Sequence, residues 1–128
     1  SCAVPGLAVR PCGFTPTHNK HAGKFCRGVQ LHVTDTGSFA SLLAGVAVIA
    51  AARRFAGFDW RREPYEFVSD RLAIDLLFGD AVPRTMIEAG VSAGDVVDWL
   101  NDHRGDFDQK RQAALHAEYD VAEAIHDA

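Results

Sequence analysis

The sequence lacks several features that would point to a specialised class of protein. Its formal net charge is −4, so it does not carry the broad basic excess that a nucleic-acid-binding surface needs. It has no long hydrophobic run, because the longest uncharged apolar stretch, residues 39–52, is too short to cross a bilayer core of about 30 Å. No basic segment followed by an apolar run stands near Ser1, so no signal peptide is expected there. These absences argue against nucleic-acid binding and against a membrane span.

Cysteine is scarce, and the three cysteines all lie near the start of the chain. This small, odd number excludes a disulfide framework and leaves at most one bridge, for which Cys12 and Cys26 are the candidate pair. The alternative is that Cys2, Cys12 and Cys26 are free or buried thiols. It is favoured because a free cysteine packs as a small hydrophobic residue.

The rest of the composition is typical of one soluble globular domain. The chain has 128 residues, of which 48% are hydrophobic and 23% charged, and it contains no internal repeat. We therefore expect residues 1–128 to form a single domain. The hydrophobic periodicities predict an α+β fold, with a small β-sheet covered by helices on one side and a long C-terminal helix.

The expected elements follow one another in the order β, β, α, β, α, α. The first strand starts at Leu7, reaches Phe14 at most and is broken at Pro11, and the second strand covers residues 26–34. A helix over 39–54 with Ser38 as N-cap, an edge strand or extended arm over 58–67, and short helices over 72–78 and 82–89 follow. A long helix runs from the Ser92/Asp95 capping box to Leu115 and can bend at Gly105, and a tail beyond residue 118 extends it or frays.

The second strand is predicted to have two different faces. Side chains two apart on a strand share a face, so one face carries only apolar groups and the other carries polar ones. The apolar face, expected to be core, holds Val29, Leu31 and Val33, and the polar face holds Cys26, Gly28, Gln30 and His32. Gly28 marks a place where a ligand or another backbone can come close.

The segment before this strand is predicted to be a loop that binds a polar, anionic ligand. Pro16, Asn19 and Gly23 favour turns, and a connection of about eleven residues is long for a hairpin, which is typical of functional loops. Such a loop can aim hydroxyl, imidazole and ammonium groups at one point. The candidate groups are those of Thr15, Thr17, His18, Lys20 and His21.

Residues 14–35, FTPTHNKHAGKFCRGVQLHVTD, resemble the signature of the NamZ-type exo-β-N-acetylmuramidases. The resemblance continues in order through residues 58–60, 65–67, 74–79 and the terminal helix, and it covers nearly the whole chain from about Gly6 to Leu115. Three positions depart from the family pattern. They are His18 in place of an aromatic residue, Asn19 in place of serine, and Lys24 in place of an acid, so that any role of a carboxylate at position 24 is absent.

This resemblance implies that the chain is the C-terminal part of a two-domain enzyme. Its partner would be a Rossmann-like N-terminal domain that carries the catalytic acid, and the substrate would be a muramic-acid-containing glycan. Family members release N-acetylmuramic acid from the non-reducing ends of peptidoglycan fragments. The resemblance also favours a secreted or periplasmic location, and no cofactor is expected.

Three other kinds of chemistry are alternatives to glycan binding. His18, His21, Cys26 and His32 could ligate a metal, but their spacing matches no standard zinc arrangement. Cys26 and His32 would lie about 20 Å apart on one strand, too far for a Cys-His nucleophile, whereas Cys26 with His18 or His21 stays open. A self-contained glycosidase needs two carboxylates, and residues 14–34 contain none. Asp35, at the strand end, is expected to be a turn or cap residue.

Ligand binding is the role that the remaining groups support. We expect Thr15, Thr17, Lys20 and His21 to hold the lactyl carboxylate or N-acetyl group of a muramic acid unit, with Gln30 and His32 on sugar hydroxyls. In the structural alternative, the loop residues only fix the loop, and Gln30 and His32 satisfy an interdomain interface. Trp60 could likewise stack on a sugar or pack at the rim of the core. A stand-alone carbohydrate-binding or protein-interaction module is the non-catalytic alternative.

Overall fold

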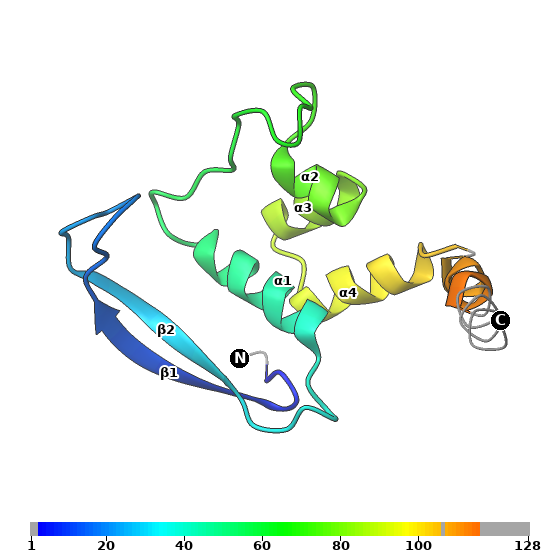
Figure 1. Ribbon diagram of the computed structural model, residues 1–128, viewed down its shortest axis with the longest axis horizontal. Coiled ribbons are helices and arrows are strands. Elements are labelled where there is room, and N and C mark those ends of the chain that lie inside the picture. The colour runs from blue at the N-terminus through cyan, green and yellow to red at the C-terminus, as the bar shows by residue number, and fades with distance from the viewer. Residues whose placement is uncertain (1–2, 106, 116–128) are drawn as a thin grey trace, which may run out of the picture. The chain divides into compact units, whose positions relative to one another are not determined.

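The computed structural model describes residues 3–105 and 107–115. The chain divides into two compact units, with the boundary between Trp60 and Arg61. The first unit contains two strands and one helix, and the second contains helices. The elements are β1 (Leu7–Phe14), β2 (Cys26–Val33), α1 (Ser41–Ala52), α2 (Ala73–Phe78), α3 (Val82–Glu88) and α4 (Ala93–Asp102), and residues 107–115 are helical as well (Figure 1). The predicted α+β class is confirmed.

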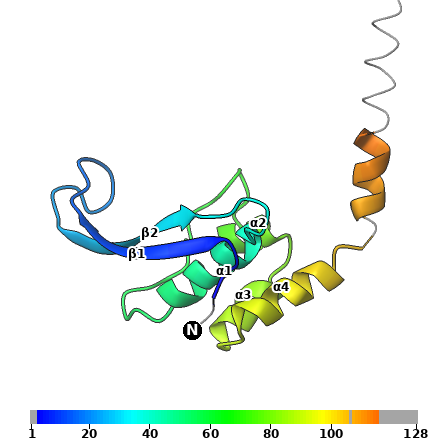
Figure 2. The ribbon, with the colours of Figure 1, turned by 90° about the horizontal axis from the view of Figure 1, so that it is seen from below.

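Strands β1 and β2 form an antiparallel hairpin in which Leu7 pairs with Val33 and Phe14 pairs with Cys26 (Figure 2). The eleven residues between the strands form the predicted loop, residues 15–25. The break expected at Pro11 is wrong, because β1 runs through Pro11, which pairs with Val29. A proline can be accommodated here since each strand of a two-stranded sheet is an edge strand, so a missing N–H need not remove a ladder hydrogen bond.

The register confirms the two predicted faces of β2, but it does not place the apolar one in a core. Val29, Leu31 and Val33 lie opposite Pro11, Val9 and Leu7, so both strands contribute to one apolar hairpin face. Val9, Val29, Leu31 and Val33 are each 44–56% exposed. The prediction that this face is core is therefore wrong for this chain, because about half of each side chain still contacts water.

Helix α1 begins later than predicted. Its N-cap is Ala40, which supplies no side-chain hydrogen bond, whereas the Ser38 hydroxyl donates to Asp35 Oδ2 at 2.6 Å. Ser38 therefore belongs to the turn before the helix, because Asp35 captures its hydroxyl. Ala44 and Val46 are the buried side chains of α1.

The segment over residues 58–67, expected as an edge strand or an extended arm, contains no strand. Its one ladder contact is an isolated bridge between Tyr65 and Val68. Glu66 and Phe67 both have positive φ, so the chain reverses direction within two residues and cannot continue as a strand. The β element expected between the helices is thus wrong, and among the described residues the hairpin is the whole sheet.

The short helices α2 and α3 are confirmed. Gly79 ends α2 in the left-handed conformation at φ 83°, and Pro83 lies in the first turn of α3, which Gly90 follows at φ 80°. Asp80 Oδ1 accepts a hydrogen bond from the Val82 N–H at 2.8 Å in the turn before α3, whose N-cap residue, Ala81, makes no side-chain cap hydrogen bond.

The terminal helix is confirmed in part. Ser92 caps α4 as predicted, because its Oγ accepts from the Asp95 N–H at 3.2 Å and its hydroxyl donates to Asp95 Oδ2 at 2.6 Å. Instead of bending, α4 ends at Asp102, and Gly105 has φ 57° before the helical residues 107–115. The predicted tail beyond residue 118 lies outside the described residues. No helix among the described residues has the length and apolarity needed to span a membrane.

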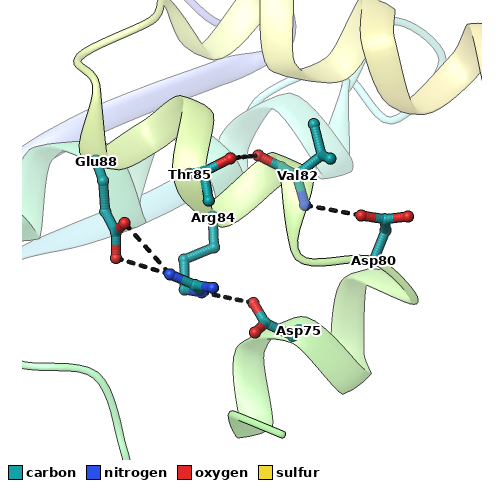
Figure 3. Close-up of polar contacts among 6 residues, drawn as sticks. All are labelled: Asp75, Asp80, Val82, Arg84, Thr85 and Glu88. Carbon is teal, nitrogen blue, oxygen red and sulfur yellow. Dashed lines mark hydrogen bonds and ion pairs between the residues drawn. The ribbon is translucent and has the colours of Figure 1, made fainter.

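A charged cluster joins α2 to α3 in the second unit. Arg84 of α3 donates from Nε to Asp75 Oδ1 of α2 at 2.7 Å, and from Nη1 to the Glu88 carboxylate at 3.1 and 3.2 Å (Figure 3). The side chain of Asp75 is 8% exposed and that of Arg84 is 19% exposed. The pKa of Arg84 is raised, first by its hydrogen bond to Asp75, so the guanidinium stays charged and compensates the buried carboxylate.

Candidate functional site

The loop over residues 15–25 is ordered by its own backbone. The Gly23 N–H donates to the Pro16 carbonyl at 2.9 Å, which closes the loop at its base, and the Lys24 N–H donates to the His21 carbonyl at 3.0 Å. Asn19 and His21 have φ of 60° and 62°, values that non-glycine residues seldom adopt. These hydrogen bonds therefore give the loop a defined backbone conformation.

All five loop residues predicted to bind ligand are exposed. Thr17 Oγ1 and His18 Nδ1 lie 2.9 Å apart, so a hydroxyl and an imidazole form one pair. Lys20 and His21 follow within the same bend. The loop can thus present an ammonium group, imidazoles and hydroxyls to a solvent-borne ligand, which is the donor set suited to a carboxylate or an amide carbonyl.

The two predicted residues on β2 lie on the polar hairpin face, where sequence reasoning missed a third group. Gln30 pairs across the sheet with Arg10, whose Nη2 donates to Gln30 Oε1. His32 pairs with Ala8. Arg10 could have been found by pairing the alternation of residues 7–14 with that of residues 26–33, because in a hairpin this register sets cross-strand neighbours. The polar hairpin face therefore carries Arg10, Gln30 and His32.

The seven predicted residues do not converge on one point. Gln30 and His32 lie four and six positions along β2 from Cys26, about 13 and 20 Å from the loop end at roughly 3.3 Å per residue. The loop and the polar hairpin face therefore form two areas, which only an extended ligand could contact together.

Gly28 has a different role from the one predicted. A Cβ built there would lie 3.0 Å from Cε1 of Phe14, so the aromatic ring fills the space that was expected for a ligand or another backbone. Cys12 and Cys26 are free. Since Cys12 pairs with Gly28 and Cys26 with Phe14, the two cysteines are diagonal neighbours, about 7–8 Å apart, which is too far for a disulfide.

The alternatives based on metal or thiol chemistry gain no support from this geometry. Across residues 3–105 and 107–115, no three His, Cys, Asp or Glu side chains group in a way that could hold a metal ion. The Cys26 thiol donates to the Lys24 carbonyl at 3.5 Å, so its hydrogen bond goes to backbone and not to an imidazole.

Similarity to known proteins shows the family of this chain. The family described as the C-terminal part of the exo-β-N-acetylmuramidase NamZ matches residues 1–116. The chain belongs to this NamZ C-terminal family. It is also 35% identical over 115 residues to the peptidoglycan β-N-acetylmuramidase NamZ of Bacillus subtilis (strain 168), a match that covers 90% of this chain and 26% of the relative. No solved structure matches the chain.

The resemblance predicted from residues 14–35 is thus confirmed. The chain spans about a quarter of the length of its NamZ relative, and the matched family is a C-terminal one. The loop and the polar hairpin face described above both lie inside the matched region. The other three quarters or so of the relative have no counterpart in this chain, and neither has any catalytic group that lies there.

Asp35, the first acid after the loop over residues 15–25, is a turn residue. Its Oδ1 accepts from the Gly37 N–H at 2.9 Å, and its Oδ2 accepts from the Ser38 hydroxyl at 2.6 Å. The Ser38 hydrogen bond, followed by that of Gly37, holds the pKa of the Asp35 carboxyl below its ordinary value of 3.8. A general acid of a glycosidase needs the opposite shift, so Asp35 is unsuited to that role.

Acidification should open this turn. Because the folded-state pKa of Asp35 is lowered, its stabilising contribution is complete above the unfolded-state pKa and is lost as the pH falls through the folded-state pKa. We expect the Gly37 amide resonance to titrate with a midpoint below 3.8, and the Ser38→Ala variant to titrate at a higher pH because the largest cause of the shift is removed. NMR over pH 2 to 6 measures both midpoints. A wild-type midpoint at or above 3.8 contradicts this account.

Proposed function

We propose that this chain is the C-terminal domain of a peptidoglycan exo-β-N-acetylmuramidase and that it supplies substrate contacts and cleft closure to a catalytic domain. The enzyme would release N-acetylmuramic acid from the non-reducing ends of peptidoglycan fragments. The observation that carries the proposal is the ordered, carboxylate-free loop over residues 15–25, which exposes a cluster of hydrogen-bond donors in a member of the NamZ C-terminal family.

The loop is suited to the features that distinguish muramic acid from other amino sugars. Its lactyl group carries a carboxylate, which the exposed Lys20 ammonium can pair with as a point charge. The Thr17 and His18 pair can donate to the carboxylate or to the N-acetyl carbonyl. Thr15 and His21 border the same bend and complete the proposed contact set.

The polar hairpin face would contact hydroxyls farther along the glycan. The hydrogen bond from Arg10 uses Gln30 Oε1 as the acceptor and leaves the Gln30 NH₂ group to donate to a ligand. His32 offers one further ring nitrogen on the same face. The separation of this face from the loop fits a substrate longer than one sugar.

The apolar hairpin face would dock the chain against the catalytic domain. Four of its side chains are about half exposed, and burying them on another domain would remove this apolar surface from water. One side of the hairpin would then face the protein and the other side the glycan. Docked in this way, residues 1–128 would act as one auxiliary domain beside the active-site cleft.

Catalysis itself would come from the other domain. Residues 14–34 contain no acid, and Asp35 is held ionised by the turn that it caps. A Rossmann-like domain with a catalytic acid is the partner that the family resemblance implies. The chain alone should therefore not hydrolyse a β-N-acetylmuramic acid glycoside, whereas the complete enzyme should.

The loop contacts can be tested in the complete enzyme with a chromogenic β-N-acetylmuramic acid glycoside. We expect Lys20→Ala to lower kcat/KM by about tenfold, which corresponds to the loss of about 1.4 kcal/mol from one charge-assisted contact. The effect should be weaker on the matching N-acetylglucosaminide, because that sugar lacks the lactyl carboxylate. His32→Ala should also lower kcat/KM. Steady-state kinetics on both substrates measures the discrimination.

Lys24→Ala is the matched control, because Lys24 is an exposed lysine in the same loop. It should leave kcat/KM within about twofold of the wild-type value. Unchanged activity of both Lys20→Ala and His32→Ala would contradict the assignment of substrate contacts, and hydrolysis by the chain alone would contradict the placement of the catalytic acid in another domain.

A further inference from the structure

A strained two-residue turn presents a fully exposed phenylalanine in the second unit. The Tyr65 N–H donates to the Val68 carbonyl at 3.1 Å, and the Val68 N–H donates to the Tyr65 carbonyl at 2.9 Å. The central residues Glu66 and Phe67 have φ of 49° and 65°. Tight hairpin turns with two positive φ values favour Asn-Gly or Gly-Gly, so a Glu-Phe pair is unfavourable here.

The Phe67 side chain gains no burial that would offset this unfavourable conformation. Positive φ is a true outlier for a bulky side chain, since its Cβ crowds the following carbonyl. Phe67 is 104% exposed, so its ring gains no apolar burial. Residues held in strained conformations cluster at ligand clamps and active sites, where an outside contact depends on that geometry.

Arg61 contacts three residues at the start of the turn. The Arg61 guanidinium carbon lies 5.5 Å from the centroid of the Tyr65 ring, and Arg61 Nη2 donates to the Pro64 carbonyl at 3.4 Å. Arg61 Nε also lies 3.7 Å from the Glu63 carboxylate. These contacts hold the start of the turn. The chain forms a small loop just before α2 (Figure 1).

The charges around the turn indicate which kind of partner Phe67 would meet. Six charged residues lie within residues 61–71, namely Arg61, Arg62, Glu63, Glu66, Asp70 and Arg71. Arginine and aromatic residues are common in protein interfaces, but Glu and Asp are depleted there, and acids make up three of these six residues. A sugar ring suits this setting better, because it combines an apolar C–H face with hydroxyls that need hydrogen-bonding partners.

We propose that the Glu66–Phe67 turn is a carbohydrate-binding site, in which the Phe67 ring stacks on the C–H face of a glycan sugar and the Glu66 carboxylate accepts a hydrogen bond from one of its hydroxyls. The choice of peptidoglycan as the glycan rests on the proposed function. The turn lies in the second unit and shares no residue with the loop or the polar hairpin face. It would be a separate subsite that holds the glycan by shape and stacking.

The test uses the 128-residue chain and, as the probe, a soluble tetrasaccharide of alternating N-acetylglucosamine and N-acetylmuramic acid. NMR titration should move the amide resonances of residues 65–68, and Phe67→Ala should weaken the Kd at least tenfold. Phe55→Ala is the matched control, because Phe55 is 74% exposed and lies in the first unit. It should leave the Kd unchanged. Chitotetraose, which lacks the lactyl group, should shift the same turn resonances, since stacking does not need that group.

Phe67→Gly separates binding from folding. Glycine adopts positive φ without strain, and we expect this relief to outweigh the extra backbone freedom that glycine gains on unfolding, so the variant should lose binding while its thermal midpoint rises by about 3 °C. Loss of binding with a preserved or raised midpoint supports a ligand role. A lower midpoint for Phe67→Gly would overturn the strain argument.

Unchanged glycan affinity of Phe67→Ala, or no binding of either probe at millimolar concentration, would overturn the site. So would a result in which Phe67→Ala weakens only the association with the catalytic domain, since that would make the turn a protein-docking contact. Each result is independent of the Lys20 kinetics in the complete enzyme, so failure of this site and failure of the proposed substrate contacts can be told apart.

Discussion

Replacing Arg84 with leucine should destabilise the second unit by about 3 kcal/mol, the lower end of the cost of breaking a buried ion pair. The substitution removes the hydrogen bond and the charge that compensate Asp75, whose side chain is 8% exposed. The lower end applies because Arg84 is 19% exposed and water can approach it. Urea unfolding followed through Trp99 fluorescence in α4 measures the loss.

The same substitution at an exposed ion pair provides the control. Arg104 Nη2 lies 3.6 Å from Asp108 Oδ1, and both side chains are exposed, so Arg104→Leu should cost at most about 0.5 kcal/mol. The double variant Asp75→Leu/Arg84→Leu should recover much of the stability, because it leaves no uncompensated buried charge; Glu88 also loses Arg84, but its side chain is 33% exposed and is solvated. If Arg84→Leu costs no more than Arg104→Leu, the pair does not hold α2 to α3.

Replacing Gly6 with alanine should destabilise the first unit by about 2–4 kcal/mol, from left-handed backbone strain together with overpacking. Gly6 has φ 69°, and its carbonyl accepts from the Thr34 N–H at 2.9 Å at the open end of the hairpin. A Cβ there would lie 2.4 Å from the Asp35 carbonyl oxygen and 2.9 Å from the Phe39 backbone. These neighbours are backbone atoms, which cannot move aside as a flexible side chain can.

Gly45→Ala is the matched control for Gly6→Ala. Gly45 lies inside α1, and a Cβ there would meet nothing within 4 Å, so alanine should stabilise the helix by about 0.5–1 kcal/mol. Circular dichroism during urea unfolding compares the two variants. A Gly6→Ala protein as stable as the wild type would show that the hairpin base does not need glycine.

Local signals were enough to predict the features that depend on neighbouring residues. The Ser92/Asp95 spacing predicted the cap of α4, Pro83 and Gly90 bracketed α3, and the alternation of residues 29–33 predicted the two faces of β2. In each case the predicted contact lies within a few residues along the chain. Backbone geometry then leaves few other arrangements.

Predictions that depended on what covers an element were less successful. The alternation marked Val29, Leu31 and Val33 as apolar, but it could not show whether another layer lies on them, and they are about half exposed. Ser38 is a residue type that favours the N-cap position, but its hydroxyl donates to the Asp35 carboxylate and α1 starts at Ser41. Arg10 joined the candidate site only once cross-strand register was known.

By itself, then, the sequence determined the family, the α+β class and the dense loop of donors, because these are recorded in residue order and short-range spacing. Only the tertiary structure decided that the loop and the polar hairpin face are two areas, that Phe14 fills the space over Gly28, and that Asp75 is compensated by Arg84. These three relations join residues that strand pairing or helix packing brings together. A pattern along the chain carries no information about such distances until the register and packing are known.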